Sequence, residues 1–196
     1  MSLRVPLFVF ATLAFSAVAF ASPQDDAYQM KYMSNLNIGD SVVNLSNSGA
    51  SGGNICVNVY TFAPDEQMIS CCACPITPNG LASLSVQSDL ISNVLTPAVP
   101  TSVVVKLIST SAATCNAAGM TGPAGTVAPG LVAWGTTLHA GPTGAYQVTE
   151  TRFTPYTAGT HELATEGTDC FFINRLGSGF GICKSCRLGG LGADKQ

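Results

Sequence analysis

The chain has 196 residues, of which 46% are hydrophobic and 10% are charged, and its formal net charge is −3 at pH 7. This length suits one domain with a hydrophobic core, and the composition is typical of a β-rich domain rather than a disordered chain. A mildly acidic chain with few charges lacks the basic surface that binds nucleic acid, so nucleic-acid partners are excluded.

The first 21 residues have the pattern of a secretory signal peptide. A short basic start at residues 1–4 precedes an apolar run at 7–20, and residues 19–21 have the small-x-small spacing that signal peptidase cleaves. The apolar run has about 14 residues, fewer than the roughly 20 that span a bilayer. We therefore expect cleavage before Ser22, a protein that is secreted to the extracellular space or cell surface, and no membrane span.

The expected mature chain begins with a long alternating segment. Between residues 28 and 38 the even positions are mostly aromatic or aliphatic, and the odd positions are mostly polar. Period-two alternation predicts a half-buried strand, which would either join its own sheet or complete the sheet of a neighbouring subunit. The residues of this candidate assembly strand are Tyr28, Met30, Tyr32, Leu36 and Ile38.

Short β-type runs separated by turn residues continue through most of the chain. A turn at residues 64–66 predicts a hairpin between two of these runs, and Asn79-Gly80 is a strong turn signal before another. The run at 102–109 is β-branched and almost continuously apolar. We predict strands at residues 42–45, 55–62, 68–72, 81–86, 102–109, 131–138 and 145–153.

Two segments have helical character. Residues 88–95 suit one or two helical turns with Ser88 as the N-cap. Residues 160–174 are predicted to form the main helix, with Thr160 as its cap and apolar residues on one face. The glycine-rich residues 188–196 are predicted to form a flexible tail.

Eight cysteines follow the predicted signal peptide, an even number that suits four disulfide bonds. Spacing alone does not select among the many pairings. Adjacent Cys71 and Cys72 on an extended segment point to opposite faces, so we expect different partners, one on the Cys56 strand and one in the 170–186 region. The long loop at 110–130 is expected to be tethered through its cysteine. The eight are Cys56, Cys71, Cys72, Cys74, Cys115, Cys170, Cys183 and Cys186.

Two other roles for these cysteines stay open. The sequences CCAC at 71–74 and CKSC at 183–186 resemble two half-sites of a zinc or iron–sulfur centre, and the second also has the spacing of a redox-active pair. The export signal favours disulfides over a metal site. Residues 187–190 are a poor helix start, which disfavours a redox pair because such pairs normally lie at a helix N-terminus.

Together these patterns predict the fold class and the domain organisation. About seven short strands, frequent turns and one late helix predict a mainly β protein, an antiparallel β-sandwich with a disulfide-tied C-terminal helix. We expect a single sandwich domain at residues 22–187, preceded by the signal peptide at 1–21 and followed by the tail at 188–196.

Three segments carry a resemblance to known proteins. They are NICVNVY at 54–60, SCCACP at 70–75 with TPNGL at 77–81, and GFGICKSCRLGG at 179–190. In these segments the chain resembles a family of secreted, cysteine-rich bacterial proteins of unknown function, and the resemblance runs over most of the mature chain. It implies secretion and a bacterial source, and it implies no activity, ligand or site residue.

No catalytic or cofactor motif stands out, so we expect neither enzymatic activity nor a cofactor. Hydrolytic triads need a histidine, and the two histidines, His139 and His161, fall at a strand end and in the first helical turn. Adjacent acids such as Asp65 and Glu66 in a turn are usually solvated rather than a glycosidase pair. The acidic residues near the start of the domain do not have the spacing of a calcium loop; they are Asp25, Asp26 and Asp40.

Two hypotheses for function remain. The first is a secreted, disulfide-stabilised structural subunit of an extracellular filament or surface layer, a homo-oligomer or polymer joined by N-terminal strand donation. The second is a monomeric module that binds carbohydrate or another surface ligand. For that module, Trp134, Tyr146 and Tyr156 are candidates for a sugar-stacking platform, although packing within the domain is the favoured role of these rings.

Overall fold

A computed structural model of the chain describes residues 26–111, 115–119, 127–142, 144–184 and 186–188. The predicted signal peptide at 1–21, Asp25, and all of the predicted tail except Leu188 lie outside the described residues. Among the described residues, no helix has the length and apolarity needed to cross a bilayer.

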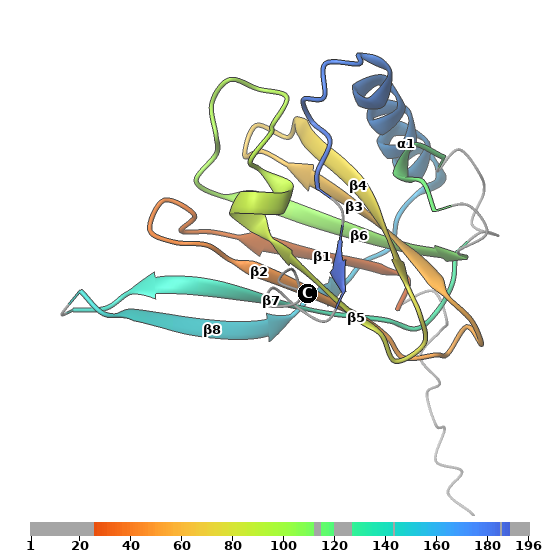
Figure 1. The fold of residues 1–196 in the computed structure, drawn as a ribbon, viewed down its shortest axis with the longest axis horizontal. Helices are drawn as coiled ribbons and strands as arrows, with labels where there is room; N and C mark the ends of the chain where they lie inside the picture. Colours follow the sequence, from red (N-terminus) through yellow and green to blue (C-terminus); the bar gives the residue numbers. More distant parts are fainter. Residues whose placement is uncertain (1–25, 112–114, 120–126, 143, 185, 189–196) are drawn as a thin grey trace, which may run out of the picture.

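The fold consists of two five-stranded antiparallel sheets (Figure 1). The first sheet has the order β4 (Met68–Ile76), β3 (Ile55–Phe62), β6 (Val103–Ser111), β1 (Tyr28–Met33), β9 (Thr154–Pro155). The second sheet has the order β10 (Arg187–Leu188), β5 (Leu81–Ser85), β2 (Val42–Asn47), β7 (Leu131–Ala140), β8 (Tyr146–Arg152). The predicted mainly β sandwich with one C-terminal helix is confirmed.

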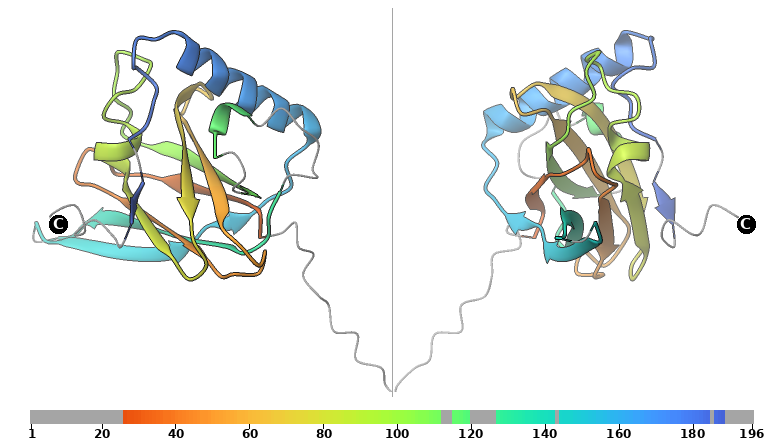
Figure 2. Two further views of the ribbon diagram at one scale, coloured as in Figure 1. Left: turned by 45° about the vertical axis from the view of Figure 1, so that its right-hand side comes forward. Right: turned by 90° about the vertical axis from the view of Figure 1, so that its left-hand side faces the viewer.

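The first sheet is buried on both faces. One face packs on the second sheet through a cluster that includes Val57, Leu107 and Leu45. The other face packs under the helix α1 (Thr160–Arg175), where Tyr60 and Ile108 meet Leu163 (Figure 2). This double covering explains why β3 and β6 are buried at most positions rather than at alternate ones.

The first strand differs from the prediction in length and in orientation. It ends at Met33, because Asn35 adopts a left-handed conformation with φ of 61° and turns the chain. The odd positions face the second sheet: Met33 joins the inter-sheet core and Gln29 Nε2 donates to Leu131 O at 2.7 Å. Of the even positions, Tyr28 packs under α1 and Tyr32 is 60% exposed.

Of the remaining residues of the predicted assembly strand, Met30 lies in β1, and Leu36 and Ile38 lie after its end. Met30 is half-buried within β1, between partners on β6 and β9. Leu36 follows the turn and contributes to the inter-sheet core, and Ile38 is half-buried in the loop before β2. Donation of this segment to another subunit stays a prediction.

The helical segments also differ from the prediction at their caps. Instead of residues 88–95 with Ser88 as the cap, a single π-helical turn covers Val86–Leu90, and Ser85 Oγ accepts from the amide of Ser88. The main helix is present as predicted, but its N-cap is Gly159 rather than Thr160, and Gly159 has no side chain that accepts a hydrogen bond. The docking of α1 therefore depends on its packing and its cross-link rather than on its cap.

Four disulfide bonds link the chain, and the described residues contain no free cysteine. Their Cα–Cα distances lie between 5.3 and 5.9 Å, within the normal range. The predicted tether is confirmed, because Cys115 is bonded to β3. The pairs are Cys56–Cys115, Cys71–Cys170, Cys72–Cys183 and Cys74–Cys186.

The two adjacent cysteines have different partners on opposite faces of β4, as predicted. Cys71 packs in the cluster under α1, and Cys72 packs against the inter-sheet core. The expectation that one of them joins the Cys56 strand at its cysteine is wrong, because the β3–β4 register places Cys56 opposite Pro75. The two predicted half-sites do meet, but as disulfides, and no cluster that would hold a metal ion is found among the described residues.

Candidate functional site at an open sheet edge

The outer edge of β4 in the first sheet is closed by the segment that follows α1. The amide of Cys71 donates to Gly181 O at 2.9 Å, and the amide of Cys183 donates to Cys71 O at 3.2 Å. Gly181 has a φ of 75°, and an added Cβ would lie 2.8 Å from Ile173 Cγ2, so glycine permits this close approach. The bond between Cys72 and Cys183 fastens the segment to the edge.

Two further edges end in strands of only two residues. In the second sheet β10 covers β5, and the bond between Cys74 and Cys186 fastens it there. In the first sheet β9 covers β1 and contains Pro155, which has no amide hydrogen to offer a further strand. Very short edge strands and prolines are known devices that prevent edge-to-edge association.

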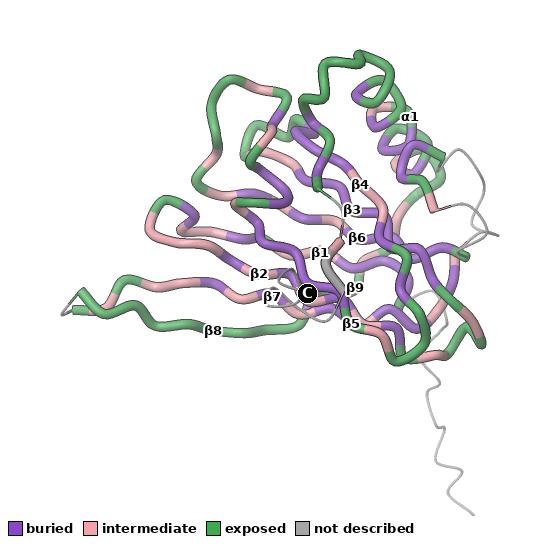
Figure 3. Tube along the Cα trace, viewed as in Figure 1, coloured by how far each residue is buried: buried purple, intermediate pink, exposed green. Residues whose placement is uncertain are grey.

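The fourth edge, β8, has no such covering among the described residues. All seven of its residues are exposed, and its only strand partner is β7. The β7–β8 hairpin projects from the body of the sandwich, and β8 is exposed along its length (Figures 1 and 3). A long exposed edge with unpaired backbone groups is a template for another strand.

The pairing of β7 with β8 shows which backbone groups are unpaired. The amide of Gly141 donates to Ala145 O and the amide of Phe153 donates to Ala133 O, so odd-numbered residues of the hairpin form the hydrogen-bonded pairs. In an antiparallel ladder the alternate residues point their amides and carbonyls away from that partner. The residues of β8 whose backbone amides and carbonyls point away from β7 are Tyr146, Val148, Glu150 and Arg152.

The side chains of β8 are arranged unevenly along the strand. The guanidinium of Arg152 lies 5.8 Å from the ring centre of Trp134, and Glu150 Oε1 accepts from Asn44 Nδ2 at 3.3 Å. At the other end Tyr146 and Val148 are 55% and 62% exposed. The open edge therefore combines apolar side chains near the hairpin tip with one carboxylate and one guanidinium near its base.

A second chemical feature lies between the first sheet and α1. Lys106 Nζ on β6 contacts Glu162 Oε1 at 2.5 Å and Glu166 Oε1 at 3.1 Å, one helical turn apart on α1. Glu166 is only 2% exposed, and its second oxygen, Oε2, has no hydrogen-bond partner among the described residues. We call Lys106, Glu162 and Glu166 the charge cluster.

Burial and charge compete at this cluster. Burial raises the pKa of Glu166 to about 7, because desolvation outweighs the opposite effect of Lys106. Burial alone would lower the pKa of Lys106, but hydrogen bonds and attraction from Glu162 and Glu166 raise it. The lysine therefore stays charged, while the buried carboxyl titrates near neutral pH.

We expect the stability of the protein to fall as the pH rises from about 4.5 to about 7. In this window Glu166 holds a proton in the folded chain and releases it in the unfolded chain, where its pKa is near the ordinary 4.5, so a higher pH favours unfolding. The loss attributable to Glu166 is on the order of 2 to 3 kcal/mol. Urea denaturation at a series of pH values measures it. Glu166→Gln should remove this part of the dependence, and an unchanged profile would contradict the assignment.

The residues considered for catalysis, which we expected to have ordinary surface roles, are not assembled into a site. His139 Nε2 lies 2.9 Å from Thr149 Oγ1 on the projecting hairpin, and His161 is exposed in the first turn of α1. Asp65 and Glu66 are both exposed in the β3–β4 turn. Neither histidine has a nucleophile and a carboxylate arranged around it in the described part of the chain.

Of the acidic residues considered for calcium, Asp40 holds a loop together, and Asp25 lies outside the described residues. Asp40 Oδ1 accepts from the amides of Ser41 and Gln87 at 2.8 and 2.9 Å, and its other oxygen accepts from Ser85 Oγ. Asp26 is exposed at the start of the described chain. Asp40 therefore orders the loop before β2 rather than forming a cation site.

The three aromatic rings considered for a stacking platform do not lie together. Trp134 and Tyr146 belong to the second sheet, at opposite ends of the β7–β8 pairing. Tyr156 packs against Tyr28 under α1, with ring centres 6.0 Å apart. The three rings therefore do not form one surface.

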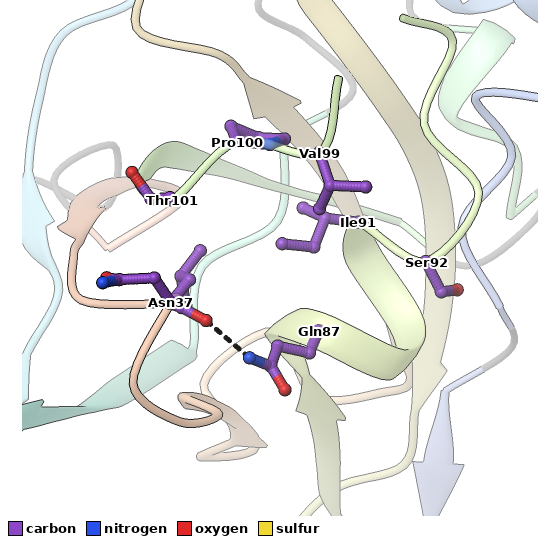
Figure 4. A pocket seen from close by; sticks show the side chains of 8 residues that line it. Asn37, Gln87, Ile91, Ser92, Val99, Pro100 and Thr101 are labelled. Carbon is purple, nitrogen blue, oxygen red and sulfur yellow. Dashed lines mark hydrogen bonds between the residues drawn. The ribbon is translucent and has the colours of Figure 1, made fainter. Parts of the chain in front are cut away.

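A cleft of about 260 Å³ lies beside the π-helical turn (Figure 4). Ile91, Val99 and Pro100 give it an apolar wall, and the side-chain Nε2 of Gln87 donates to Leu36 O at 2.6 Å. The other polar residues that line the cleft are Asn37, Ser92 and Thr101.

Comparisons with known proteins found no matching family model, no matching curated protein and no matching solved structure. The resemblance to secreted bacterial proteins consequently stays a prediction. The strongest functional features are those of the molecule itself, the open edge of β8 and the charge cluster.

The sequence predictions did not identify either feature. The signals for the charge cluster were a lone lysine inside the most apolar strand run, at Lys106, and two glutamates four residues apart on the predicted helix. The run at 145–153 was predicted as a strand, but its position at an edge depends on strand order.

Proposed function

We propose that the protein is a secreted, disulfide-stabilised structural subunit of an extracellular assembly, and that subunits join by strand addition at β8. The observation that carries this proposal is the contrast among the four edges. Three are closed by short strands, a proline or a cross-linked segment, whereas β8 keeps four outward-facing residues with unpaired backbone groups. Selective exposure of one edge is the arrangement that strand addition requires.

The cross-links support a structural role. Three of the four bonds join β4 to residues 170–186, and so they fix α1 and the two segments that close neighbouring edges. Disulfides of this kind persist in oxidising extracellular compartments. A cross-linked subunit with one uncovered edge can associate at that edge without unfolding.

Assembly through β8 demands less of the subunit than donation of the N-terminal segment. Residues Tyr28–Met33 are hydrogen-bonded to β6 on one side and to β9 on the other. Donating them would break these pairings and withdraw Tyr28 and Met33 from the two cores of their own subunit. Strand addition at β8 breaks no internal pairing, and we place the contact there.

Val148→Pro is the direct test of this proposal. The amide of Val148 faces outward, so proline removes a donor from the open edge without removing a β7–β8 hydrogen bond. The matched control is Val148→Thr, which keeps both the amide and the β-branched shape. We expect size-exclusion chromatography and electron microscopy under non-reducing conditions to show multimers for the wild type and the control, and monomers for Val148→Pro.

Other outcomes decide against the proposal. Multimers of Val148→Pro like those of the wild type would overturn assembly through β8. A wild-type protein that is monomeric at all concentrations would overturn the structural role. That result would favour a monomeric carbohydrate-binding module. Its candidate surface is the face of the second sheet on which Trp134, Asn44 and Glu150 are neighbours.

A further inference from the structure

We propose that the strand added at β8 is the β8 of a second copy, antiparallel and centred on Thr149. This inference rests on the proposed function and identifies the partner in it. The seven-residue strand runs from Tyr146 to Arg152, so Thr149 is its middle residue. A two-fold axis at this residue makes each strand the partner of the other along its full length.

The backbone pattern selects this register. Only registers that pair even-numbered residues with even-numbered residues bring the outward amides and carbonyls together. With the axis at Thr149, Tyr146 pairs with the partner's Arg152 and Val148 with the partner's Glu150. The two strands then form four hydrogen-bonded residue pairs with two bonds each, so all outward backbone groups of both strands are satisfied.

The neighbouring registers are worse in backbone pairing and in charge. An axis at Glu150 leaves three hydrogen-bonded pairs and places two Glu150 carboxylates directly opposite each other, which is destabilising. An axis at Val148 also leaves three pairs and leaves Arg152 without a partner residue. The self-complementary register is therefore the one centred on Thr149.

The side chains agree with this register. Each Tyr146 ring faces the partner's Arg152, an arrangement that suits a cation–π contact. Each Val148 lies opposite the aliphatic stem of the partner's Glu150, and no like charges are opposed. The second sheet of one copy then continues into the second sheet of the other, and together they form a sheet of ten strands, five from each copy.

A cysteine at position 149 tests the register. Thr149 and the partner's Thr149 form a non-hydrogen-bonded pair, whose Cα atoms lie about 4.5 Å apart, within the range of a disulfide. We expect Thr149→Cys to give a covalent dimer on mild oxidation, seen by non-reducing electrophoresis. The matched control is Gln147→Cys, because the two copies of residue 147 are four positions out of register, about 13 Å apart. Gln147→Cys combined with Thr151→Cys should restore the cross-link.

The outcomes separate this inference from the proposed function. Cross-linking of Thr149→Cys without cross-linking of Gln147→Cys supports the register, provided that mass mapping finds the four native disulfides intact. Multimers in solution with no cross-link at position 149 overturn the inference and leave the proposed function standing. Monomers throughout overturn both. If Thr149→Cys does not fold, Thr149→Lys places two ammonium groups at the axis and should weaken dimerisation several-fold more than Gln147→Lys; equal weakening overturns the inference.

Discussion

Lys106→Met is expected to lower the free energy of unfolding by about 2 kcal/mol at pH 8. The lysine is the cation that contacts both carboxylates of the charge cluster, and Glu166 is 2% exposed. Removing the cation leaves a buried carboxylate without a counter-charge, and that is far more costly than losing an exposed ion pair. Methionine keeps most of the volume that packs near Phe62 and Tyr156, so little of the loss comes from a cavity.

Guanidinium chloride denaturation of four chains measures this effect. Lys106→Met combined with Glu166→Leu removes both buried charges and should recover most of the lost stability. Lys184→Met changes an exposed lysine and serves as the control, with an expected effect within about 0.5 kcal/mol. At pH 5 the cost of Lys106→Met should be smaller, because Glu166 is then protonated. A double variant as unstable as Lys106→Met alone would contradict the role given to the buried carboxylate.

Removal of single disulfides is expected to cost unequal amounts, in an order set by the connections that remain. Cys56–Cys115 closes a loop of 59 residues, and its loss should cost about 4 kcal/mol. Without Cys71–Cys170, the remaining Cys72–Cys183 bond already limits the unfolded chain. The ring lost then holds no residue between Cys71 and Cys72 and only 12 between Cys170 and Cys183, and its loss should cost about 3 kcal/mol.

Cys74–Cys186 should matter least of the bonds compared here. With Cys72–Cys183 in place, its ring holds one residue between Cys72 and Cys74 and two between Cys183 and Cys186, so its loss should cost about 2 kcal/mol. Paired alanine substitutions, unfolded in denaturant without reductant, give the three values. Equal costs for Cys74–Cys186 and Cys56–Cys115 would show that local packing, rather than restriction of the unfolded chain, determines the contribution of these bonds.

Much of the fold could be predicted from the sequence. Strand runs, turns and the helix at 160–174 are local patterns, and they give the sandwich class and nearly all elements. The even number of cysteines after a predicted export signal indicated four bonds. The pairing could not be predicted, because it depends on which β3 residue faces which β4 residue, and Cys56 faces Pro75 rather than another cysteine.

The orientation of β1 and the site were hidden for related reasons. Alternation indicates two faces, but it was the odd positions of β1 that turned toward the opposite sheet, where a carbonyl satisfies the buried polar Gln29. An open edge is a property of strand order. The β8 sequence reads like any exposed strand until three other edges are seen to be closed. Likewise, the lone Lys106 has its role only because α1 docks its two glutamates above β6.

The interleaved bonds at β4 also decide how the subunit would bear a pulling force. The Cys72–Cys183 bond directly joins two residues that are 111 positions apart, and so it bypasses about 400 Å of fully extended chain. A tensile load applied between the two ends of the domain crosses this bond, so the covalent chain from Ala73 to Ile182 carries no tension. That part of the chain, which includes α1 and the projecting hairpin, would come under tension only after a reductant cut the bond.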